Sequence, residues 1–119
     1  MTGKRKVLVV DDNEDATIAL SMLLQAMGYQ TAEAYDGEQA LEVAESFRPD
    51  LILLDLGLPG LDGYEVARRL RDAMGSVPRL VALTGWGQEE ARLRTADAGF
   101  DEHLVKPVDA ETLSRVLSG

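Results

Sequence analysis

The sequence contains no cysteine, and it has no apolar run long enough to cross a membrane. The missing cysteine excludes disulfides, thiol catalysis and cysteine–metal sites. The chain starts with a basic segment, MTGKRKVLVV, whose apolar run is too short for a signal peptide. These absences predict a soluble protein of the cytoplasm that has no membrane partner.

Positive charge is also scarce, because 12 Lys and Arg residues stand against 21 Asp and Glu residues and leave a formal net charge of −9. Broad nucleic-acid binding needs a basic face, so the composition argues against a nucleic-acid partner. The same charge suits a site that holds a cation, although many proteins are acidic only because charge keeps them soluble. Charge alone therefore decides little.

Five short apolar segments alternate with five segments of helical periodicity along the 119 residues. The expected strands are residues 6–10, 30–35, 51–54, 79–83 and 102–105. Such alternation predicts a parallel sheet with helices on both faces. The runs VLVV, LILL and LVAL suit buried central strands, whereas QTAEAY and EHLV suit the edges. The pattern predicts one α/β domain over residues 1–119, a flavodoxin-like (βα)5 sandwich with strand order 2-1-3-4-5.

The expected helices follow the strands and turn one apolar face inward. In the first helix this face consists of Ala16, Leu20, Leu23, Leu24 and Met27. Gly28 should end the helix, because glycine tolerates the left-handed conformation of a C-terminal cap. A fourth helix is expected over residues 88–97, and Asp109 should cap the last helix.

Polar residues stand where the expected strands end. Asp11 and Asp12 follow the first strand, Asp55 the third, Thr84 the fourth and Lys106 the fifth. The carboxyl ends of parallel strands share one rim, so these side chains should surround one crevice. Carboxylates this close repel each other unless a proton or a cation neutralises them. A hard divalent ion with oxygen ligands, such as Mg²⁺, is the simpler solution.

The same crevice suits a phosphoryl group. A cation, the ammonium of Lys106 and the hydroxyl of Thr84 match the charge that develops on a transferring phosphoryl group. Asp55 would then be the nucleophile and form an aspartyl-phosphate. Each residue also has a simpler interpretation, with Asp11 and Asp12 as a helix cap, Asp55 as a turn residue and the others as surface polar groups. The joint occurrence at ordered strand ends favours the site.

The motifs VLVVDDN, LLDLGLPGLDG, LTG and VKP occur in this order, and with them the whole chain resembles a response-regulator receiver domain of two-component signalling. The resemblance implies that Asp55 is the phosphoacceptor. It also implies that Asp11, Asp12, Asp55 and the backbone carbonyl of Gly57 hold Mg²⁺, with Asp12 a more direct ligand than Asp11.

Further roles come with the resemblance. Thr84 would be the switch hydroxyl that turns toward the phosphoryl group, and Lys106 would contact the phosphate and precede a cis bond to Pro107. One position departs from the family, because His103 stands three residues before Lys106, where Phe or Tyr is usual. His103 is either a switch residue that brings a proton near neutral pH into the pocket, or an exposed edge-strand residue, which is the simpler interpretation.

Two features outside the motifs allow two interpretations each. Trp86 either covers the crevice and changes the lifetime of the phosphorylated state, or packs on its own loop. Ile18 and Met22 lie off the core face of the first helix, one turn apart. They form either a docking patch for a four-helix phosphotransfer partner or a pair of scattered exposed apolar residues.

The resemblance implies a phosphorylation switch. A histidine kinase or a histidine phosphotransfer protein would donate the phosphoryl group to Asp55, and output would be by protein contact, since no output domain is expected within these residues. The domain would not be an enzyme, because it would catalyse only its own slow phosphorylation and dephosphorylation. The run LTGWGQEE…GFDEHLVKPVD is similar in style to receivers of hybrid kinases, and a stand-alone regulator is the other context.

Two functions of other classes are weighed against the switch. The first is a Mg-dependent phosphatase that works through an aspartyl-phosphate, but Gly57 stands where such enzymes usually carry a second Asp. The second is a nucleotide- or flavin-binding module, but the loop DDNED would repel phosphate unless a metal intervened.

Overall fold

The computed structural model describes residues 5–56, 63–75, 78–84, 99–106 and 108–118. The strands are β1 (Lys6–Val10), β2 (Gln30–Ala34), β3 (Leu51–Asp55), β4 (Arg79–Thr84) and β5 (Glu102–Val105), and the helices are α1 (Glu14–Ala26), α2 (Gly37–Phe47), α3 (Gly63–Met74) and α5 (Ala110–Ser118). All strand pairs are parallel, and the order is β2-β1-β3-β4-β5. The predicted fold class is therefore confirmed. The helix expected over residues 88–97 lies outside the described residues.

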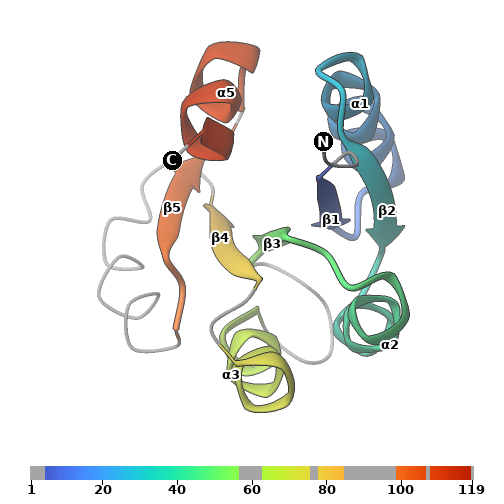
Figure 1. Ribbon diagram of the computed structural model, residues 1–119, viewed down its shortest axis with the longest axis vertical. Coiled ribbons are helices and arrows are strands. Elements are labelled where there is room, and N and C mark those ends of the chain that lie inside the picture. The colour runs from blue at the N-terminus through green and yellow to red at the C-terminus, as the bar shows by residue number, and fades with distance from the viewer. Residues whose placement is uncertain (1–4, 57–62, 76–77, 85–98, 107, 119) are drawn as a thin grey trace.

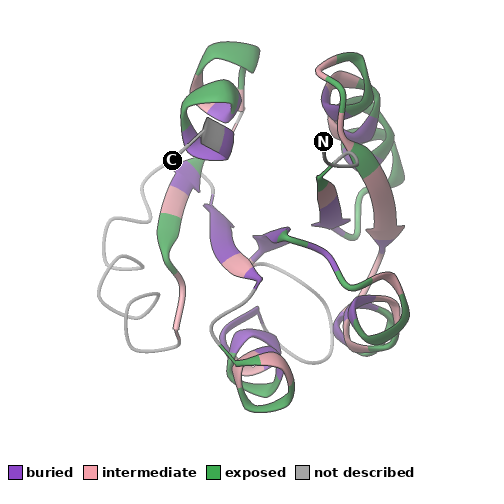
Figure 2. Ribbon diagram, viewed as in Figure 1, coloured by how far each residue is buried: buried purple, intermediate pink, exposed green. Residues whose placement is uncertain are grey.

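The sheet forms a middle layer between two pairs of helices. Helices α1 and α5 cover one face and α2 and α3 the other (Figure 1). Side chains alternate between faces along each strand. In β3, Leu51 and Leu53 pack into the core under α1 and α5, whereas Ile52 and Leu54 pack into the core under α2 and α3. Both faces of the central strands are buried (Figure 2), which explains their unbroken apolar runs.

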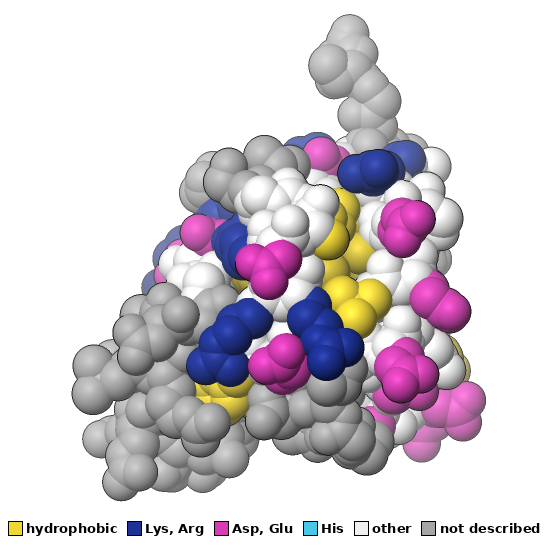
Figure 3. Space-filling view, turned by 90° about the horizontal axis from the view of Figure 1, so that it is seen from below, with side chains coloured by type: hydrophobic (Ala, Val, Ile, Leu, Met, Phe, Trp, Pro, Cys, Tyr) yellow, Lys and Arg dark blue, Asp and Glu magenta, His cyan; other side chains and the backbone are white. Residues whose placement is uncertain are grey.

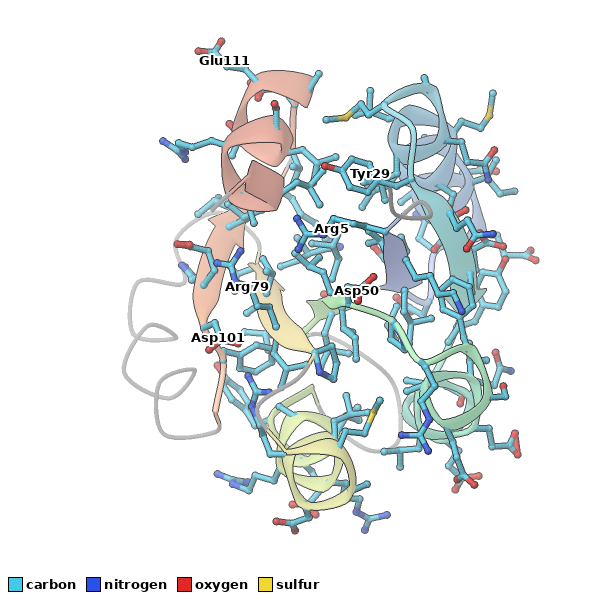
Figure 4. All side chains as sticks on the ribbon, viewed as in Figure 1. Arg5, Tyr29, Asp50, Arg79, Asp101 and Glu111 are labelled. Atoms are coloured by element: carbon cyan, nitrogen blue, oxygen red, sulfur yellow. The ribbon has the colours of Figure 1, made fainter. Side chains whose placement is uncertain are left out.

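The last helix is fixed at its C-terminal end by two arginines from other elements. Arg5, directly before β1, donates to the carbonyl of Leu117 at 2.9 Å, and Arg79, at the start of β4, donates to the carbonyl of Val116 at 2.8 Å. Both arginines are labelled in Figure 4. Cations suit the partial negative charge at this end of a helix, so the arginines hold α5 against the sheet.

Helix α1 corrects one expectation about its buried face. Ala16 is exposed, and Thr17 and Ser21 are buried beside Leu24. The hydroxyl groups are satisfied where they lie, since Ser21 donates to a carboxylate oxygen of Glu33 on β2 at 2.9 Å. A count of apolar residues at helical spacing overlooks such polar positions. The other residues expected on this face do contact the core, since Leu24 is buried and Leu20, Leu23 and Met27 pack against the core. The helix also ends before Gly28, whose φ of +98° is left-handed.

Two of the strands that carry candidate residues, β3 and β4, reach one residue further than expected. Asp55 is the last residue of β3 and Thr84 the last residue of β4. Their backbones are thus part of the sheet, which fixes where each side chain starts. Within the described part of the chain, no helix has the length and apolar character needed to cross a membrane.

Candidate functional site

Four strands deliver polar side chains to one rim of the sheet. Asp11 continues the β1–β2 ladder, since its N–H donates to the carbonyl of Ala34 at 3.1 Å. Lys106 continues the β4–β5 ladder in the same way, with its N–H donating to the carbonyl of Thr84 at 2.8 Å. Asp55 lies between them at the end of β3. The predicted convergence of Asp11, Asp55 and Lys106 is what the structure shows.

Lys106 bridges two carboxylates from different strands. Its Nζ lies 2.9 Å from Oδ2 of Asp11 and 3.2 Å from Oδ2 of Asp55. The side chains of Asp11 and Asp55 are only 4% and 12% exposed, whereas that of Lys106 is 35% exposed. Little water reaches the carboxylates, so the ammonium is a main source of compensation for their charge. The three side chains are called the carboxylate cluster below.

The pKa values of Asp11 and Lys106 favour the charged forms of both groups. Burial works to raise the pKa of Asp11, but hydrogen bonds from Lys106 and from the N–H of Asn13 lower it, and the net pKa lies below the ordinary value. Burial works to lower the pKa of Lys106, but its hydrogen bond to Asp11 and the charges of Asp55 and Asp11 raise it above the ordinary value. A charged Lys106 beside an ionised Asp11 is the stable arrangement.

Carboxylate oxygens of Asp11, Asp12 and Asp55 lie within 4.8 Å of one another. Asp12 is exposed beside the two buried carboxylates, so an ion could approach from solvent on its side. Oδ1 of Asp11 accepts a hydrogen bond from Asn13 N–H at 3.0 Å, and Oδ2 accepts one from Lys106. Each oxygen retains a second lone pair. The set therefore fits a small hard cation that takes oxygen ligands and keeps several waters.

Two residues that support Asp11 were not predicted to belong to the site. The hydroxyl of Thr17 lies 3.1 Å from the carbonyl oxygen of Asp11 and 2.9 Å from that of Asn13, and Thr17 is fully buried. Asn13 also caps α1, since its Oδ1 accepts a hydrogen bond from Ala16 N–H at 3.1 Å. These contacts fix the turn between β1 and α1. The sequence signal was a hydroxyl two residues after the acidic run, at a position that faces the sheet.

Thr84 and His103 meet on the other side of the rim. Oγ1 of Thr84 lies 3.0 Å from Nε2 of His103, and Thr84 is 2% exposed. His103 is half-buried on β5. The interpretation of His103 as a simple exposed edge residue is therefore wrong, and its role as a switch residue stays a prediction. The two side chains are called the hydroxyl pair below.

The remaining predicted residues divide into two groups. Gly57, Trp86 and Pro107 lie outside the described residues, so the predictions about them stay predictions. Ile18 and Met22 are 49% and 64% exposed on α1, as expected for residues off its core face.

Charges of both signs mix on the surface. On the face seen in Figure 3, the Lys and Arg side chains that are drawn lie interspersed with Asp and Glu side chains. A basic face of the kind that nucleic-acid binding needs is thus not formed by the described residues on this side.

Comparison with known proteins gives consistent relatives. The sequence model of the "Response regulator receiver domain" family matches residues 7–118. The chain is 34% identical over 108 residues to sporulation initiation phosphotransferase F of Bacillus subtilis (strain 168), covering 91% of this chain and 86% of that protein. It is 42% identical over 103 residues to the alkaline phosphatase synthesis transcriptional regulatory protein PhoP of the same strain, covering 87% of this chain and 42% of PhoP. The chain thus spans less than half the length of PhoP.

Solved structures agree with the sequence relatives. The chemotaxis protein CheY4 of Vibrio cholerae superposes with a TM-score of 0.90 at 32% identity, covering 98% of each chain. A putative response regulator from Chloroflexus aurantiacus J-10-fl superposes with a TM-score of 0.88 at 31% identity, covering 97% of this chain and 96% of the other. Together with the match over residues 7–118, these likenesses show that the chain belongs to the response regulator receiver domain family of two-component systems.

Proposed function

We propose that this receiver domain is switched by transfer of a phosphoryl group to Asp55. The observation that carries the proposal is the position of Lys106, whose Nζ lies 2.9 Å from Asp11 and 3.2 Å from Asp55. A carboxylate at the end of a buried strand is thus held next to a fixed positive charge. Such an arrangement suits a nucleophile whose product carries new negative charge.

The donor would be a phosphohistidine of a histidine kinase or of a histidine phosphotransfer protein. A carboxylate oxygen of Asp55 attacks phosphorus, the phosphorus–nitrogen bond breaks, and the released imidazole takes up a proton. Lys106 would accompany the transferred charge, and the hydroxyl of Thr84 would donate to a phosphoryl oxygen once its side chain turns toward Asp55. Catalysis here would consist of positioning and electrostatic stabilisation.

The acidic residues would hold Mg²⁺. Asp11, Asp12 and Asp55 offer hard oxygen donors within 4.8 Å of one another, and the backbone carbonyl of Gly57 is the fourth protein ligand we propose. When bound, the ion would neutralise charge on the carboxylates and the phosphoryl oxygens. The chain's own contribution is the spacing of the ligands, which the sheet and the contact of Thr17 with the carbonyl of Asp11 maintain.

The consequences of phosphorylation would be read through protein contacts. The domain would catalyse its own slow phosphorylation and dephosphorylation without turnover of an external substrate. Ile18 and Met22, exposed on α1, are candidates for contact with the phosphotransfer partner. The name phosphotransferase for the relative in Bacillus subtilis supports phosphoryl transfer as the chemistry of the group. A cytoplasmic location, where kinases of this system act, stays a prediction.

The test is incubation with Mg²⁺ and acetyl phosphate, followed by intact-mass measurement. The wild type should gain the mass of one phosphoryl group, and Asp55→Asn should gain none. Asp72→Asn, an exposed position on α3, is the matched control and should be labelled like the wild type. No labelling of the wild type, or equal labelling of Asp55→Asn, would overturn the proposal. Sustained hydrolysis of a generic phosphoester would instead favour the phosphatase alternative.

A further inference from the structure

The hydroxyl of Thr84 is engaged on β5. Its oxygen lies 3.0 Å from Nε2 of His103 and 3.4 Å from the carbonyl oxygen of Leu104. Among the described residues, β1 and β3 supply no hydrogen-bond partner to this oxygen. Because Thr84 is 2% exposed, water does not replace these partners. The side chain is therefore held toward β5 and away from the carboxylate cluster.

The hydroxyl of Thr84 can change direction only by rotation of the side chain, not by a shift of the backbone. The backbone of Thr84 is fixed by the ladder, since its carbonyl accepts a hydrogen bond from Lys106 N–H at 2.8 Å. A threonine side chain chooses among a few staggered χ1 positions. Donation of this hydroxyl to a phosphoryl group on Asp55 needs a different χ1 rotamer from the one in which it contacts His103.

We propose that His103 restrains Thr84 and thereby opposes phosphorylation of Asp55. The inference rests on the function proposed above. His103 is a positioning residue that acts through Thr84, because its bond stabilises the χ1 position that faces β5. The restraint does not depend on which ring nitrogen carries the proton, since Nε2 either accepts from or donates to Oγ1. A phenylalanine in its place has no atom that makes this bond.

The effect of the restraint on affinity follows from the hydrogen bonds that Thr84 loses and gains when it turns. Turning Thr84 replaces the contact with His103 by a contact with the phosphoryl group, so one hydrogen bond is traded for another. A ligand that needs the less populated side-chain position binds more weakly in proportion to that population. Loss of one hydrogen bond of ordinary strength corresponds to about a two- to tenfold change in affinity.

The experiment measures binding of beryllofluoride, a phosphoryl mimic, by calorimetry in the presence of Mg²⁺. His103→Phe should bind it about two- to tenfold more tightly than the wild type. His103→Gln keeps a polar amide at a similar reach and should bind within about twofold of the wild type. Thermal unfolding of each variant confirms that the fold is intact, which keeps a loss of fold from being mistaken for a loss of affinity.

A double-mutant cycle tests whether His103 acts through Thr84. In a Thr84→Val background, His103→Phe should leave the affinity unchanged, because the hydroxyl that it frees is absent. His103 is the only histidine of the chain, so its ring ¹⁵N signals are assigned without ambiguity. Addition of beryllofluoride should shift these signals in the wild type and much less in Thr84→Val.

The outcomes separate the restraint from the function on which it rests. If the wild type and His103→Phe bind beryllofluoride with equal affinity, or if His103→Phe binds it more weakly, the restraint is overturned while phosphorylation of Asp55 stands. An equal gain from His103→Phe in the Thr84→Val background also overturns it. If the wild type does not bind beryllofluoride and acetyl phosphate does not label it, the function itself fails and the restraint fails with it.

Discussion

The carboxylate cluster and the hydroxyl pair lie on one rim but are held by different kinds of contact. Asp11, Asp55 and Lys106 join three strands through charge, and the two carboxylates are nearly buried. Thr84 and His103 join two neighbouring strands through one hydrogen bond of 3.0 Å. Charge-assisted hydrogen bonds are roughly twice as strong as ordinary ones. The cluster is therefore suited to be a fixed site, and the pair is suited to change.

The largest expected effect comes from removing the charge that holds the carboxylate cluster. Lys106→Met leaves Asp11 and Asp55 without their ammonium partner and removes a charge-assisted contact worth about 1.5–3 kcal/mol. The rate of labelling by acetyl phosphate should fall by about tenfold or more. Intact-mass measurement over time gives the rate.

Arg68→Met is the control for that comparison. Arg68 is 55% exposed on α3, where it lies 3.6 Å from Glu65, so its loss removes the same formal charge from an exposed position whose ion pair is with Glu65 and not with the carboxylate cluster. Its labelling rate should stay within about twofold of the wild type. Similar labelling rates for Lys106→Met and the wild type would mean that the contacts of Lys106 with Asp11 and Asp55 do not hold the site in its reactive arrangement.

The second largest effect is expected at Arg71, which holds together the strands that carry the hydroxyl pair. Arg71 on α3 donates to the carbonyls of Gly99 and Pro78 at 3.0 and 2.7 Å, and it pairs with Asp101 directly before β5. Figure 4 labels Asp101 at this end of β5, and its Oδ2 also accepts a hydrogen bond from Leu80 N–H at 2.9 Å. Arg71 thus ties the starts of β4 and β5 to α3.

Arg71→Met should lower the free energy of unfolding by about 1–3 kcal/mol, because it leaves several carbonyls without their donor. Urea unfolding measures this loss. Hydrogen exchange should speed up at β5 amides more than at β1 amides, since the tie acts on the half that holds the hydroxyl pair. Arg69→Met, 52% exposed and paired with Glu65, should cost less than about 0.5 kcal/mol. An equal increase in the exchange rates of β1 and β5 amides would contradict the idea that Arg71 stabilises mainly the strands that carry the hydroxyl pair.

The sequence predicted the carboxylate cluster better than the hydroxyl pair, for physical reasons. Apolar runs determine which strands are buried, and parallel strands bring their carboxyl ends to one rim, so Asp11, Asp55 and Lys106 had to meet. The contact of His103 with Thr84 depends on the β4–β5 register, in which Ala82 pairs with His103, and on two side-chain rotamers. No periodicity in the sequence encodes these.

Thr17 was missed for a related reason. Helical spacing identifies buried positions through apolar residues, and a threonine is counted as polar. Its hydroxyl is nevertheless satisfied inside the protein by the carbonyls of Asp11 and Asn13. Buried polar groups are tolerated when they are hydrogen-bonded, so burial of Thr17 follows from the turn geometry and not from hydropathy.

The smallest effect is expected at Asp109, an exposed carboxylate that contrasts with the buried cluster. Its Oδ1 accepts a hydrogen bond from Thr112 N–H at 2.8 Å at the start of α5. The hydrogen bonds from the backbone and the side chain of Thr112 hold the pKa of Asp109 below its ordinary value. A carboxyl whose pKa is lowered on folding adds stability above its unfolded pKa, and that stability is lost as pH falls through the folded pKa.

Asp109→Asn keeps an oxygen for the cap and removes only the charge. The wild type should therefore have a slightly higher Tm near pH 7, and the difference should vanish as the pH falls below the ordinary pKa of an aspartate and through the lowered pKa of folded Asp109. Thermal unfolding at several pH values measures it, with Asp72→Asn on α3 as the control. A difference that grew on acidification would reverse the sign of the linkage. The lowered pKa of Asp109 would then not explain how its charge affects stability. The contrast between this exposed carboxylate and the buried carboxylates of Asp11 and Asp55 would no longer hold.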